Sequence, residues 1–486
     1  MNYTQASFRI DKTDFLKGNN VYDEFPEGGA IASTVGMNSF SKPGLLAQSP
    51  ALGSSVSGSL PVGGVVSWGI GSGASAPAAI SVYTNGSNNG TWYSVNSSTG
   101  AMTAVGSADT TRSYKLGITD TVFYNGSFYT TSETDICKNS ADLATRDQSW
   151  WITTSAKTAL TSGIPHPLLV YESIMYIADG RYLHKLDGST ISLQVWDAPP
   201  DHIITAMTEY NGLIYIVAEP YKNLTGSVHG LSQMFSWDGL LESWYEQYFL
   251  DYRINSLYVY KNRLYAWTNQ FMGLWTGSEL EPIYTVSSQV FKCHITAISD
   301  SMVFADGMKL VRYGKPFSPN LVRKFYNYIN ASGALPFTGI VSLTGDSLIV
   351  TESHASASPN YFISNLNTPP SSGTKTISFN RRFFNQPVKP RGIVVTIESV
   401  LTSGQSVKVG YRDMFGQMQY PDSDSGTFSY ATTKMRNAIA WEFNVSSKHA
   451  TRSMLPVIEI TGGVHVRSID YLYEGSEAKI KKTIVA

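Results

Sequence analysis

Histidines, the side chains most often used in catalysis and metal binding, are few and scattered along this 486-residue chain. No two of them fall at the helical or strand spacing that a metal site requires. Neither the Gly-x-Ser-x-Gly turn of serine hydrolases nor a Walker phosphate loop occurs. We therefore predict no catalytic residue, no bound cofactor and no metal ligand, and we interpret the single histidines as structural. They include His166, His184, His202, His294 and His465.

Two short acidic patterns are the strongest remaining candidates for chemistry. The segment Asp422–Gly426, with the sequence Asp-Ser-Asp-Ser-Gly, resembles the first half of a calcium loop. No further acidic ligand follows at the offset that such a loop needs, so we interpret this segment as a hairpin turn. Glu242 and Glu246 flank Trp244 and Tyr245, a combination that would suit a sugar-cleaving pair of carboxylates.

The elements that would position such residues follow from a repeat in the middle of the chain. Each copy has an aromatic lead, a turn pair and an apolar-aromatic strand, and successive copies begin 47, 39 and 50 residues apart. A period of roughly 40 to 50 residues with hairpin chemistry in each unit is typical of a β-propeller with four-stranded blades. The clearest copies are Tyr124–Tyr129, Tyr171–Tyr176, Tyr210–Tyr215 and Tyr260–Tyr265, with weaker echoes at Ser301–Phe304 and Gly345–Val350.

A second landmark, a strand that runs into a turn, follows in the same units. Asn-Gly and Asp-Gly pairs adopt the positive φ angles of tight hairpins at low cost, so two turn signals in each unit indicate three or four short strands. We count seven units, with six or eight as alternatives, and the first is the least regular. Copies of this landmark are Leu183–Gly188, Met234–Gly239, Leu274–Gly277 and Leu310–Gly314.

The position of the two glutamates within the repeat argues against a glycosidase. Glu242 and Glu246 follow the turn at Trp237–Gly239, which places them on the outer part of a blade. Propeller glycosidases instead hold their paired carboxylates on inner strands around the central channel. The nearest match to the Asp-box turn of sialidases is a single copy at Ser87–Trp92 that lacks the aspartate. The sequence therefore does not favour a sialidase.

Composition fits a folded protein that is nearly all β. Hydrophobic residues make up 42% of the chain and aromatic residues 12%, which supplies a core for two or three domains. The one helix candidate spans Asn320–Tyr328. Cys137 and Cys293 fall in different units, so we expect buried thiols rather than a disulfide framework. The first residues lack the character of a signal peptide, and no stretch approaches the roughly 18 to 20 apolar residues of a membrane span.

Two boundaries divide the chain into three expected segments. Residues 1–60 show no repeat and predict an N-terminal arm docked on the propeller or on a neighbour, with a loose tail as the alternative. Residues 61–372 form the predicted β-propeller, which ends in the linker Pro369–Gly373. Residues 373–486 have longer strands and predict a β-sandwich or jelly roll. The predicted fold is thus all-β, a seven-bladed propeller followed by a C-terminal β-sandwich.

Charge divides along the second of these boundaries. Residues 373–486 hold 15 Lys and Arg against 9 Asp and Glu, a net of +6, and the remainder holds 21 against 28, a net of −7. A basic C-terminal part and an acidic remainder favour binding of an acidic partner or head-to-tail packing of copies of the chain. The alternative is a basic face that is simply exposed to solvent. The longest basic run is Lys479–Lys482, so nucleic-acid recognition is not indicated. Candidate interface anchors are Trp150, Trp151, Trp244, Tyr245, Tyr248 and Tyr252.

The three parts, in this order, resemble virion proteins of tailed bacteriophages, above all the tail hub or nozzle proteins of short-tailed phages. The arm contributes the segments Phe25–Gly29 and Ser41–Leu45. The C-terminal part carries the resemblance best, through Lys389–Ile393, Met454–Ile460 and Val466–Glu474. The resemblance covers the order of parts along the whole chain without a signature motif, and it brings no catalytic residues.

This resemblance implies a homo-oligomeric ring, with six copies expected, around the channel through which DNA leaves the head. One end would dock on an adaptor protein and the other on a distal plug, needle or fibre, and DNA would pass the lumen without sequence readout. The expected location is the virion tail, after synthesis in the host cytoplasm. Stiff propellers and sandwiches, covered sheet edges and cyclic symmetry suit this role.

Two other classes of function stay open at this point. The first is a receptor-binding or decoration protein on the virion surface, whose blade-face loops would bind a glycan. Aromatic and carboxylate pairs clustered on one blade face would favour it. The second is a propeller glycosidase, which requires two carboxylates that converge on the central channel.

Overall fold

The structure is a computed structural model in which the chain divides into two compact units. The first combines Met1–Ala51, Leu310–Asn330 and Asn365–Ala486, and the second combines Leu52–Lys309 and Ala331–Ser364. Within the described residues, no helix is long and apolar enough to cross a bilayer. The described residues are 4–10, 33–34, 37–38, 45–48, 64–72, 79–84, 87–155, 158–221, 231–240, 243–299, 301–314, 324–330, 336–343, 346–352, 360–363, 373–379, 381–421, 426–429, 438–443 and 450–475.

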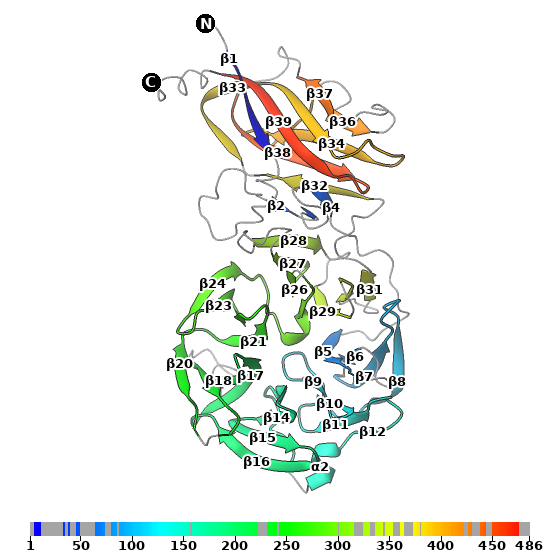
Figure 1. Cartoon of the computed structure of the whole chain (residues 1–486), viewed down its shortest axis with the longest axis vertical. Helices are drawn as coiled ribbons and strands as arrows, with labels where there is room; N and C mark the ends of the chain where they lie inside the picture. The colour runs from blue at the N-terminus through cyan, green and yellow to red at the C-terminus, as the bar shows by residue number, and fades with distance from the viewer. Residues whose placement is uncertain are drawn as a thin grey trace. The chain divides into compact units, whose positions relative to one another are not determined.

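Seven consecutive sheets form a seven-bladed β-propeller (Figure 1). In each blade the strands lie side by side in chain order. Blade 1 contains β5 (Val65–Ile70), β6 (Ala79–Thr84), β7 (Gly90–Val95) and β8 (Met102–Asp109); blade 2 contains β9 (Thr121–Tyr124), β10 (Ser127–Thr131), β11 (Ile136–Ser140) and β12 (Arg146–Asp147); blade 3 contains β13 (Leu168–Tyr171), β14 (Ile174–Asp179), β15 (Tyr182–Asp187) and β16 (Thr190–Asp197).

The next three blades also have four strands each, and the seventh has three within the described residues. Blade 4 contains β17 (His202–Tyr210), β18 (Leu213–Pro220), β19 (Ser232–Trp237) and β20 (Glu246–Leu250); blade 5 contains β21 (Ile254–Val259), β22 (Leu264–Thr268), β23 (Phe271–Trp275) and β24 (Leu280–Thr285); blade 6 contains β25 (Ile295–Ala297), β26 (Ser301–Asp306), β27 (Lys309–Gly314) and β28 (Lys324–Asn330); blade 7 contains β29 (Phe337–Ser342), β30 (Leu348–Glu352) and β31 (Asn360–Ile363). The predicted all-β class and the count of seven blades are confirmed.

The repeated turn pairs close the hairpin between the first two strands of four blades. In blade 2, Asn125 and Gly126 have φ angles of 42° and 73°. The type I′ turn needs positive φ at both central residues, and its twist matches that of the strands it joins. Glu172-Ser173 in blade 3, Asn211-Gly212 in blade 4 and Lys261-Asn262 in blade 5 also have positive φ at both positions. The pattern of the repeat therefore corresponds to one hairpin geometry.

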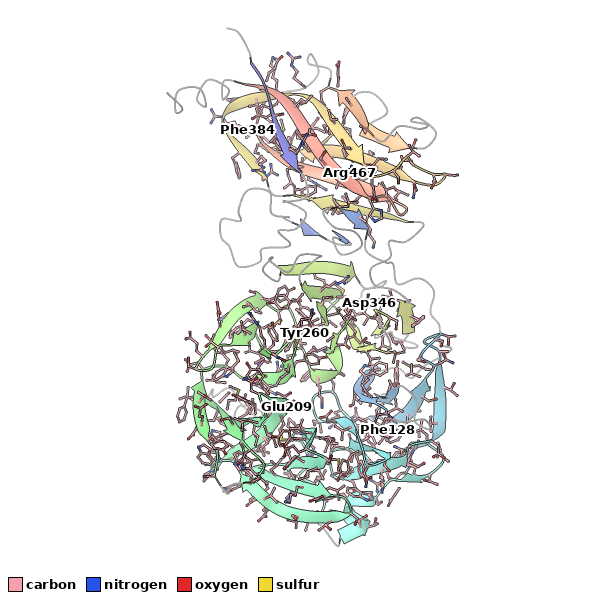
Figure 2. The ribbon with its side chains drawn as sticks, in the orientation of Figure 1. Phe128, Glu209, Tyr260, Asp346, Phe384 and Arg467 are labelled. Carbon is pink, nitrogen blue, oxygen red and sulfur yellow. The ribbon has the colours of Figure 1, made fainter. Side chains whose placement is uncertain are left out.

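Apolar side chains pack between neighbouring blades and hold them together. Phe128 of blade 2, labelled in Figure 2, is fully buried in a cluster with Val66 and Trp92 of blade 1. Blade 7 meets blade 1 in another such cluster, in which Val341 of β29 and Trp68 of β5 take part. The ring thus closes through side-chain packing between the first and last blades. This packing fixes the positions of the first strands, which surround the centre.

The predicted helix at Asn320–Tyr328 is wrong where the structure describes it. Residues 324–328 lie in strand β28, and residues 320–323 lie outside the described residues. The sequence of β28, Lys-Phe-Tyr-Asn-Tyr-Ile-Asn, is rich in aromatic residues, which favour strands, and β28 completes the four strands of blade 6. A helix instead occurs at α2 (Trp150–Ser155), after β12.

Two of the six predicted interface anchors belong to this helix and are buried. Trp150 is 6% exposed and Trp151 is 2% exposed. The Trp150 ring packs edge-on against Tyr129 with centroids 4.8 Å apart, and the Trp151 ring lies 5.5 Å from that of His184. Both tryptophans belong to the core between blades 2 and 3. The prediction of an exposed anchor is therefore wrong for this pair, because α2 turns both rings into the core.

Ten further strands, all in the first unit, form one connected sheet network. Its main path runs β1-β39-β33-β38-β32-β2, and β34, β35, β36 and β37 branch from it. Their bounds are β1 (Thr4–Ile10), β2 (Ser33–Thr34), β32 (Thr374–Ser378), β33 (Arg382–Ile397), β34 (Ser406–Arg412), β35 (Met418–Gln419), β36 (Thr427–Ser429), β37 (Ala438–Glu442), β38 (Thr451–Thr461) and β39 (Val466–Gly475). Two short strands, β3 (Met37–Asn38) and β4 (Ala47–Gln48), pair with each other.

The described start of the predicted N-terminal arm is a strand of this network. β1 pairs antiparallel with β39 over its whole length, from Thr4 opposite Gly475 to Ile10 opposite Ile469. Ile10 is buried in the core, and Arg9 Nε donates to Asp470 Oδ1 at 2.6 Å. The first strand therefore docks on the C-terminal sheet, whereas the sequence indicated the propeller or a neighbour. Most other residues of 1–60 lie outside the described residues.

Candidate functional site

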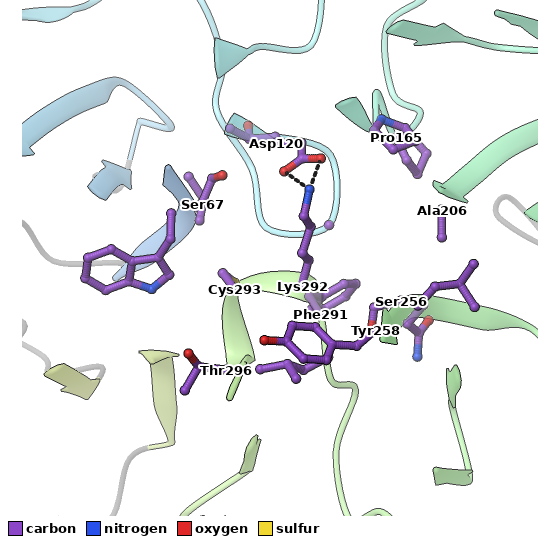
Figure 3. Close-up of a pocket in the computed structure, with 18 of the residues that line it drawn as sticks. Ser67, Asp120, Pro165, Ala206, Ser256, Tyr258, Phe291, Lys292, Cys293 and Thr296 are labelled. Atoms are coloured by element: carbon purple, nitrogen blue, oxygen red, sulfur yellow. Dashed lines mark hydrogen bonds and ion pairs between the residues drawn. The ribbon is translucent and has the colours of Figure 1, made fainter. Parts of the chain in front are cut away.

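A cavity of about 370 Å³ lies where the first strands of the seven blades converge (Figure 3). Every blade contributes lining residues, either from its first strand or from the residues just before that strand. Apolar side chains alternate in the wall with hydroxyl groups such as those of Ser67, Ser256 and Thr296. Because packed strands form the wall, the cavity is a preformed concave site of the kind that holds small ligands.

One ion pair crosses this cavity. Lys292 begins the short 3-10 helix that leads into the first strand of blade 6, and its Nζ donates to the two carboxylate oxygens of Asp120 at 2.8 and 3.0 Å. Asp120 immediately precedes the first strand of blade 2, and Figure 3 shows the lysine reaching to it. The side chain of Lys292 is 52% exposed, whereas that of Asp120 is 11% exposed. The cavity is therefore open to solvent on the side of the lysine.

The Asp120 carboxylate also organises the backbone around it. Its Oδ1 accepts a hydrogen bond from the Thr121 backbone N–H at 2.8 Å, and its Oδ2 accepts one from the Leu168 N–H at 2.9 Å. The Leu168 carbonyl in turn lies 3.4 Å from Lys292 Nζ. One carboxylate therefore joins the start of blade 2 to the start of blade 3 and to the lysine of blade 6. With these partners, the geometry is that of a structural tie.

The histidines that the structure describes lie apart and act as core or edge residues. The ring nitrogens of His166 lie 3.2 Å from the Ala178 carbonyl and 3.3 Å from the Glu133 carbonyl, and burial lowers its pKa. Among the described residues, no group of three His, Cys, Asp or Glu side chains could hold a metal ion. His166, His184 and His294 are buried, and His202 and His465 are partly exposed.

The propeller should become less stable as the pH is lowered, because of His294. Burial lowers the pKa of His294 from 6.5 to about 4, and backbone hydrogen bonds to Thr338 and Gln289 offset only part of the effect. As the pH falls through 6.5, His294 becomes protonated in the unfolded chain but stays neutral in the folded chain. Stability present above pH 6.5 is thus lost progressively toward pH 4, by about 2 kcal/mol between pH 7 and pH 5.

Urea unfolding at pH 7 and pH 5 measures this loss. His294→Asn keeps an acceptor for the Phe291 N–H, which lies 3.3 Å from His294 Nδ1, but it removes the titrating ring. We expect the difference in unfolding free energy between the two pH values to shrink by about 2 kcal/mol in this variant. His166→Asn should shrink it as well, since burial shifts the pKa of His166 in the same direction. Parallel pH profiles for wild type and His294→Asn would refute the assignment.

Both cysteines are buried free thiols, as the sequence predicts. Cys137 lies in β11 of blade 2, and burial raises its pKa to about 12. Cys293 lies in the short 3-10 helix η1 (Lys292–His294) and lines the central cavity, and burial raises its pKa further. A thiol with a raised pKa holds its proton at neutral pH and is a poor nucleophile. Neither cysteine is therefore suited to covalent catalysis.

The acidic patterns give no catalytic pair in the described part of the chain. Residues Asp422 to Ser425 of the calcium-like segment lie outside the described residues, as does Glu242. Glu246 begins β20, the last strand of blade 4, so its predicted place on the outer part of a blade is confirmed. Its carboxylate accepts a hydrogen bond from the Tyr248 hydroxyl.

Exposed aromatic side chains gather around this same last strand of blade 4. Trp244 is 36% exposed, Tyr245 55%, and Tyr252 37%. Phe249, within β20, is 61% exposed and was not singled out from the sequence. Three of the six predicted anchors are thus exposed, and the remaining one, Tyr248, is partly buried. We call Trp244, Tyr245, Phe249 and Tyr252 the blade 4 aromatic group.

Comparison with known proteins assigns neither a family nor a function. No protein-family model matches the chain, and no curated protein matches it. Among solved structures it is similar to an exo-β-1,3-galactanase of Phanerochaete chrysosporium with bound galactotriose, at 9% identity over 85% of this chain and 96% of that one, with a TM-score of 0.33. It is also similar to BamB from Moraxella catarrhalis, at 13% identity over 74% and 98% with a TM-score of 0.36, and to Hsv2 from Kluyvelomyces marxianus, at 8% over 66% and 94% with a TM-score of 0.36.

TM-scores this low support no conclusion about fold or function. The assignment of the fold rests on the sheets themselves, which are seven in number and follow one another along the chain. The chain contains a seven-bladed propeller.

Proposed function

We propose that this chain is a structural component of a bacteriophage virion, a subunit of a tail hub or nozzle ring that forms part of the DNA exit channel. The observation that carries the proposal concerns the three C-terminal segments that resemble such proteins. Lys389–Ile393 lies in β33, Met454–Ile460 in β38 and Val466–Glu474 in β39. These three strands are adjacent in the order β39-β33-β38, so the resembling segments are packed together in one part of the fold.

The proposal includes a β-sandwich for the C-terminal strands. β33 pairs with β38 through Arg382–Val388 and with β39 through Lys389–Ile397, so one long strand serves two sets of partners. β34 pairs with β38, whereas β39 pairs with β1 and β33. A single buried cluster includes residues of β33, β34, β38 and β39, among them Val395, Val409 and Ile458. Two layers that share one core would account for this pattern.

The central cavity favours a scaffold over a glycosidase. Glycosidases need two carboxylates that flank the bond to be cleaved. Among the lining residues that the structure describes, Asp120 is the only carboxylic acid. Its oxygens are engaged by Lys292, Thr121 and Leu168, so it lacks both a partner acid and a free lone pair directed at a substrate. A propeller enzyme would carry its catalytic residues in this central cavity, so the lack of a second acid among the described lining residues supports the structural proposal.

Surface groups are suited to contacts between copies. The blade 4 aromatic group offers large apolar area on a blade edge, and aromatic side chains are the usual anchors of protein interfaces. The net charges of +6 for residues 373–486 and −7 for the rest would attract unlike parts of neighbouring subunits. In a closed ring each copy repeats these contacts, so individually weak ones add up.

The mass of the purified chain tests the proposal. We expect mass photometry to find a discrete closed oligomer, either alone or after addition of an adaptor-bearing tail extract. Six copies of the 53.2 kDa chain would weigh about 320 kDa. Negative-stain images of that species should show rings with an open lumen. A chain that stays monomeric at every concentration and with every virion fraction would contradict the proposal.

A receptor-binding protein on the virion surface is the second candidate, and one observation favours it. Aromatic and carboxylate side chains pair on the edge of blade 4: Tyr245 donates to Asp238 Oδ2 at 3.0 Å, and Tyr248 donates to Glu246. Such pairs are common in glycan sites, where a ring stacks on the sugar and an acid accepts its hydroxyls. A monomer that binds host glycans and loses binding in Tyr245→Ala would favour this second function over a ring subunit.

A further inference from the structure

The C-terminal sheet exposes two apolar side chains on an ordered loop. Phe415 is 79% exposed and Met414 is 52% exposed, and both lie in the loop that joins β34 to β35. The carboxylate of Asp413 holds this loop, because its Oδ1 accepts from the backbone N–H groups of Phe415 at 2.9 Å and of Gln417 at 3.0 Å. A loop that is already ordered loses little conformational entropy when it binds, so this one is suited to contact a partner.

A third exposed apolar side chain, that of Phe383, lies close to this loop. Phe383 is 79% exposed, whereas its neighbour Phe384 is buried in the core. Arg381 joins the two segments, because its Nη1 donates to the Asp413 carbonyl at 2.7 Å and to the Ser453 hydroxyl at 3.0 Å. Ser453 is the residue of β38 that pairs with Phe383. We call the three exposed side chains the C-terminal knob: Phe383, Met414 and Phe415.

Basic side chains accompany the knob. The described residues 381–383, 411–419 and 451–455 include four arginines and one acid, Asp413, which its own loop engages. Arg412 donates to a carbonyl of the loop at 3.4 Å, which keeps its charge beside the knob. Aromatic residues, methionine and arginine are enriched at protein interfaces. The knob therefore fits a partner surface that is both apolar and acidic. The four arginines are Arg381, Arg382, Arg412 and Arg452.

The blade 4 aromatic group has this matching character. Its most exposed members are Phe249, at 61%, and Tyr245, at 55%, and both lie at the last strand of the blade. The described residues 237–240 and 243–253 hold three acids and one base, a net charge opposite to that beside the knob. The charged residues are Asp238, Glu246, Asp251 and Arg253. One chain thus carries both an apolar basic surface and an apolar acidic one.

We propose that the C-terminal knob of one copy docks on the blade 4 aromatic group of the next copy of this chain. Two unlike surfaces of one chain form a heterologous contact, which repeats from copy to copy and gives a ring where the rotation closes. The net charges of +6 for residues 373–486 and −7 for the rest act in the same direction. This inference rests on the proposed ring subunit and names the contact that would join its copies.

Two blocked variants of the full-length chain test the contact. Phe415→Glu brings a negative charge to the acidic edge of blade 4, and Phe249→Lys brings a positive charge to the arginines of the knob. Each should weaken self-association at least about thirtyfold, the effect of losing an interface anchor, and leave a monomer of 53.2 kDa in mass photometry. An equimolar mixture of the two variants keeps one intact contact. It should give a heterodimer, two copies of the chain at about 106 kDa, and nothing larger.

Two further exposed apolar residues supply matched controls. Val400, between β33 and β34, is 44% exposed, and Leu193, in the last strand of blade 3, is 43% exposed. Val400→Glu and Leu193→Lys introduce the same charges outside the two surfaces, so both variants should assemble as the wild type does. All four altered side chains are exposed, so the midpoints of urea unfolding should match that of the wild type.

The outcomes separate this contact from the proposed ring. Wild-type assembly in either blocked variant, or a mixture without heterodimer, would overturn the contact and leave the ring proposal standing if the wild type forms a ring. Open chains of wild-type protein that both blocked variants abolish would support the contact and contradict the ring. A chain that stays monomeric and binds phosphatidylserine vesicles through the knob would identify a lipid surface as the occupant and overturn the contact. A monomer that forms no heterodimer would contradict both proposals.

Discussion

Replacing Trp237 by alanine should lower the unfolding free energy of the propeller by about 3 to 5 kcal/mol, the cost of deleting a fully buried tryptophan. Trp237 ends β19 of blade 4 and is 1% exposed. Its ring packs edge-on against Tyr176 of blade 3, with centroids 5.7 Å apart, and tilted against Trp196 at 6.3 Å. The alanine variant would therefore open a cavity between two blades that their backbones cannot close.

Urea unfolding followed by tryptophan fluorescence measures this loss, since nine of the ten tryptophans lie in the second unit. The matched control is Trp244→Ala. Trp244 touches the same cluster, with its ring 4.9 Å from that of Phe235, but it is 36% exposed. We expect it to cost less than about 2 kcal/mol. Equal losses in the two variants would show that packing between blades 3 and 4 does not hold the propeller together.

The propeller could be predicted from the sequence because its signals are local. A type I′ turn is specified by two adjacent residues, and Asn125-Gly126 and Asn211-Gly212 are the pairs that tolerate positive φ best. Their recurrence made the weaker pair Lys261-Asn262 recognisable as the same element. The helix expected at Asn320–Tyr328 failed for the opposite reason: the strand there is needed as the fourth strand of blade 6, and the aromatic residues of Lys324–Asn330 give only a weak local signal for it.

The central site could not be predicted, because its residues are distant in the sequence. Asp120 and Lys292 are 172 positions apart, and each is a single charged residue in an unremarkable segment. They meet because the propeller returns blade 6 to face blade 2, which is a property of the closed ring. One shared feature is visible only in the structure: Asp120 and Lys292 both lie within three residues of the start of the first strand of a blade.

Asp120→Ala should cost about 2 to 4 kcal/mol of propeller stability. The change leaves the backbone N–H groups of Thr121 and Leu168 without their acceptor, at a position that is 8% exposed. It also leaves the ammonium of Lys292 without its carboxylate. The same fluorescence-detected unfolding in urea measures the loss.

Lys292→Met separates the contribution of the ion pair from that of the backbone bonds. The lysine side chain is 52% exposed and gains little from its partner, while Asp120 keeps both N–H donors, so we expect a cost of about 1 kcal/mol. The double variant should cost no more than Asp120→Ala alone, because the lysine left unpaired by the first change is removed by the second. The contrary result would be that Lys292→Met lowers the unfolding free energy as much as Asp120→Ala does. That result would show that Asp120 stabilises the propeller through its ion pair with Lys292 and not through the backbone hydrogen bonds that join blades 2 and 3.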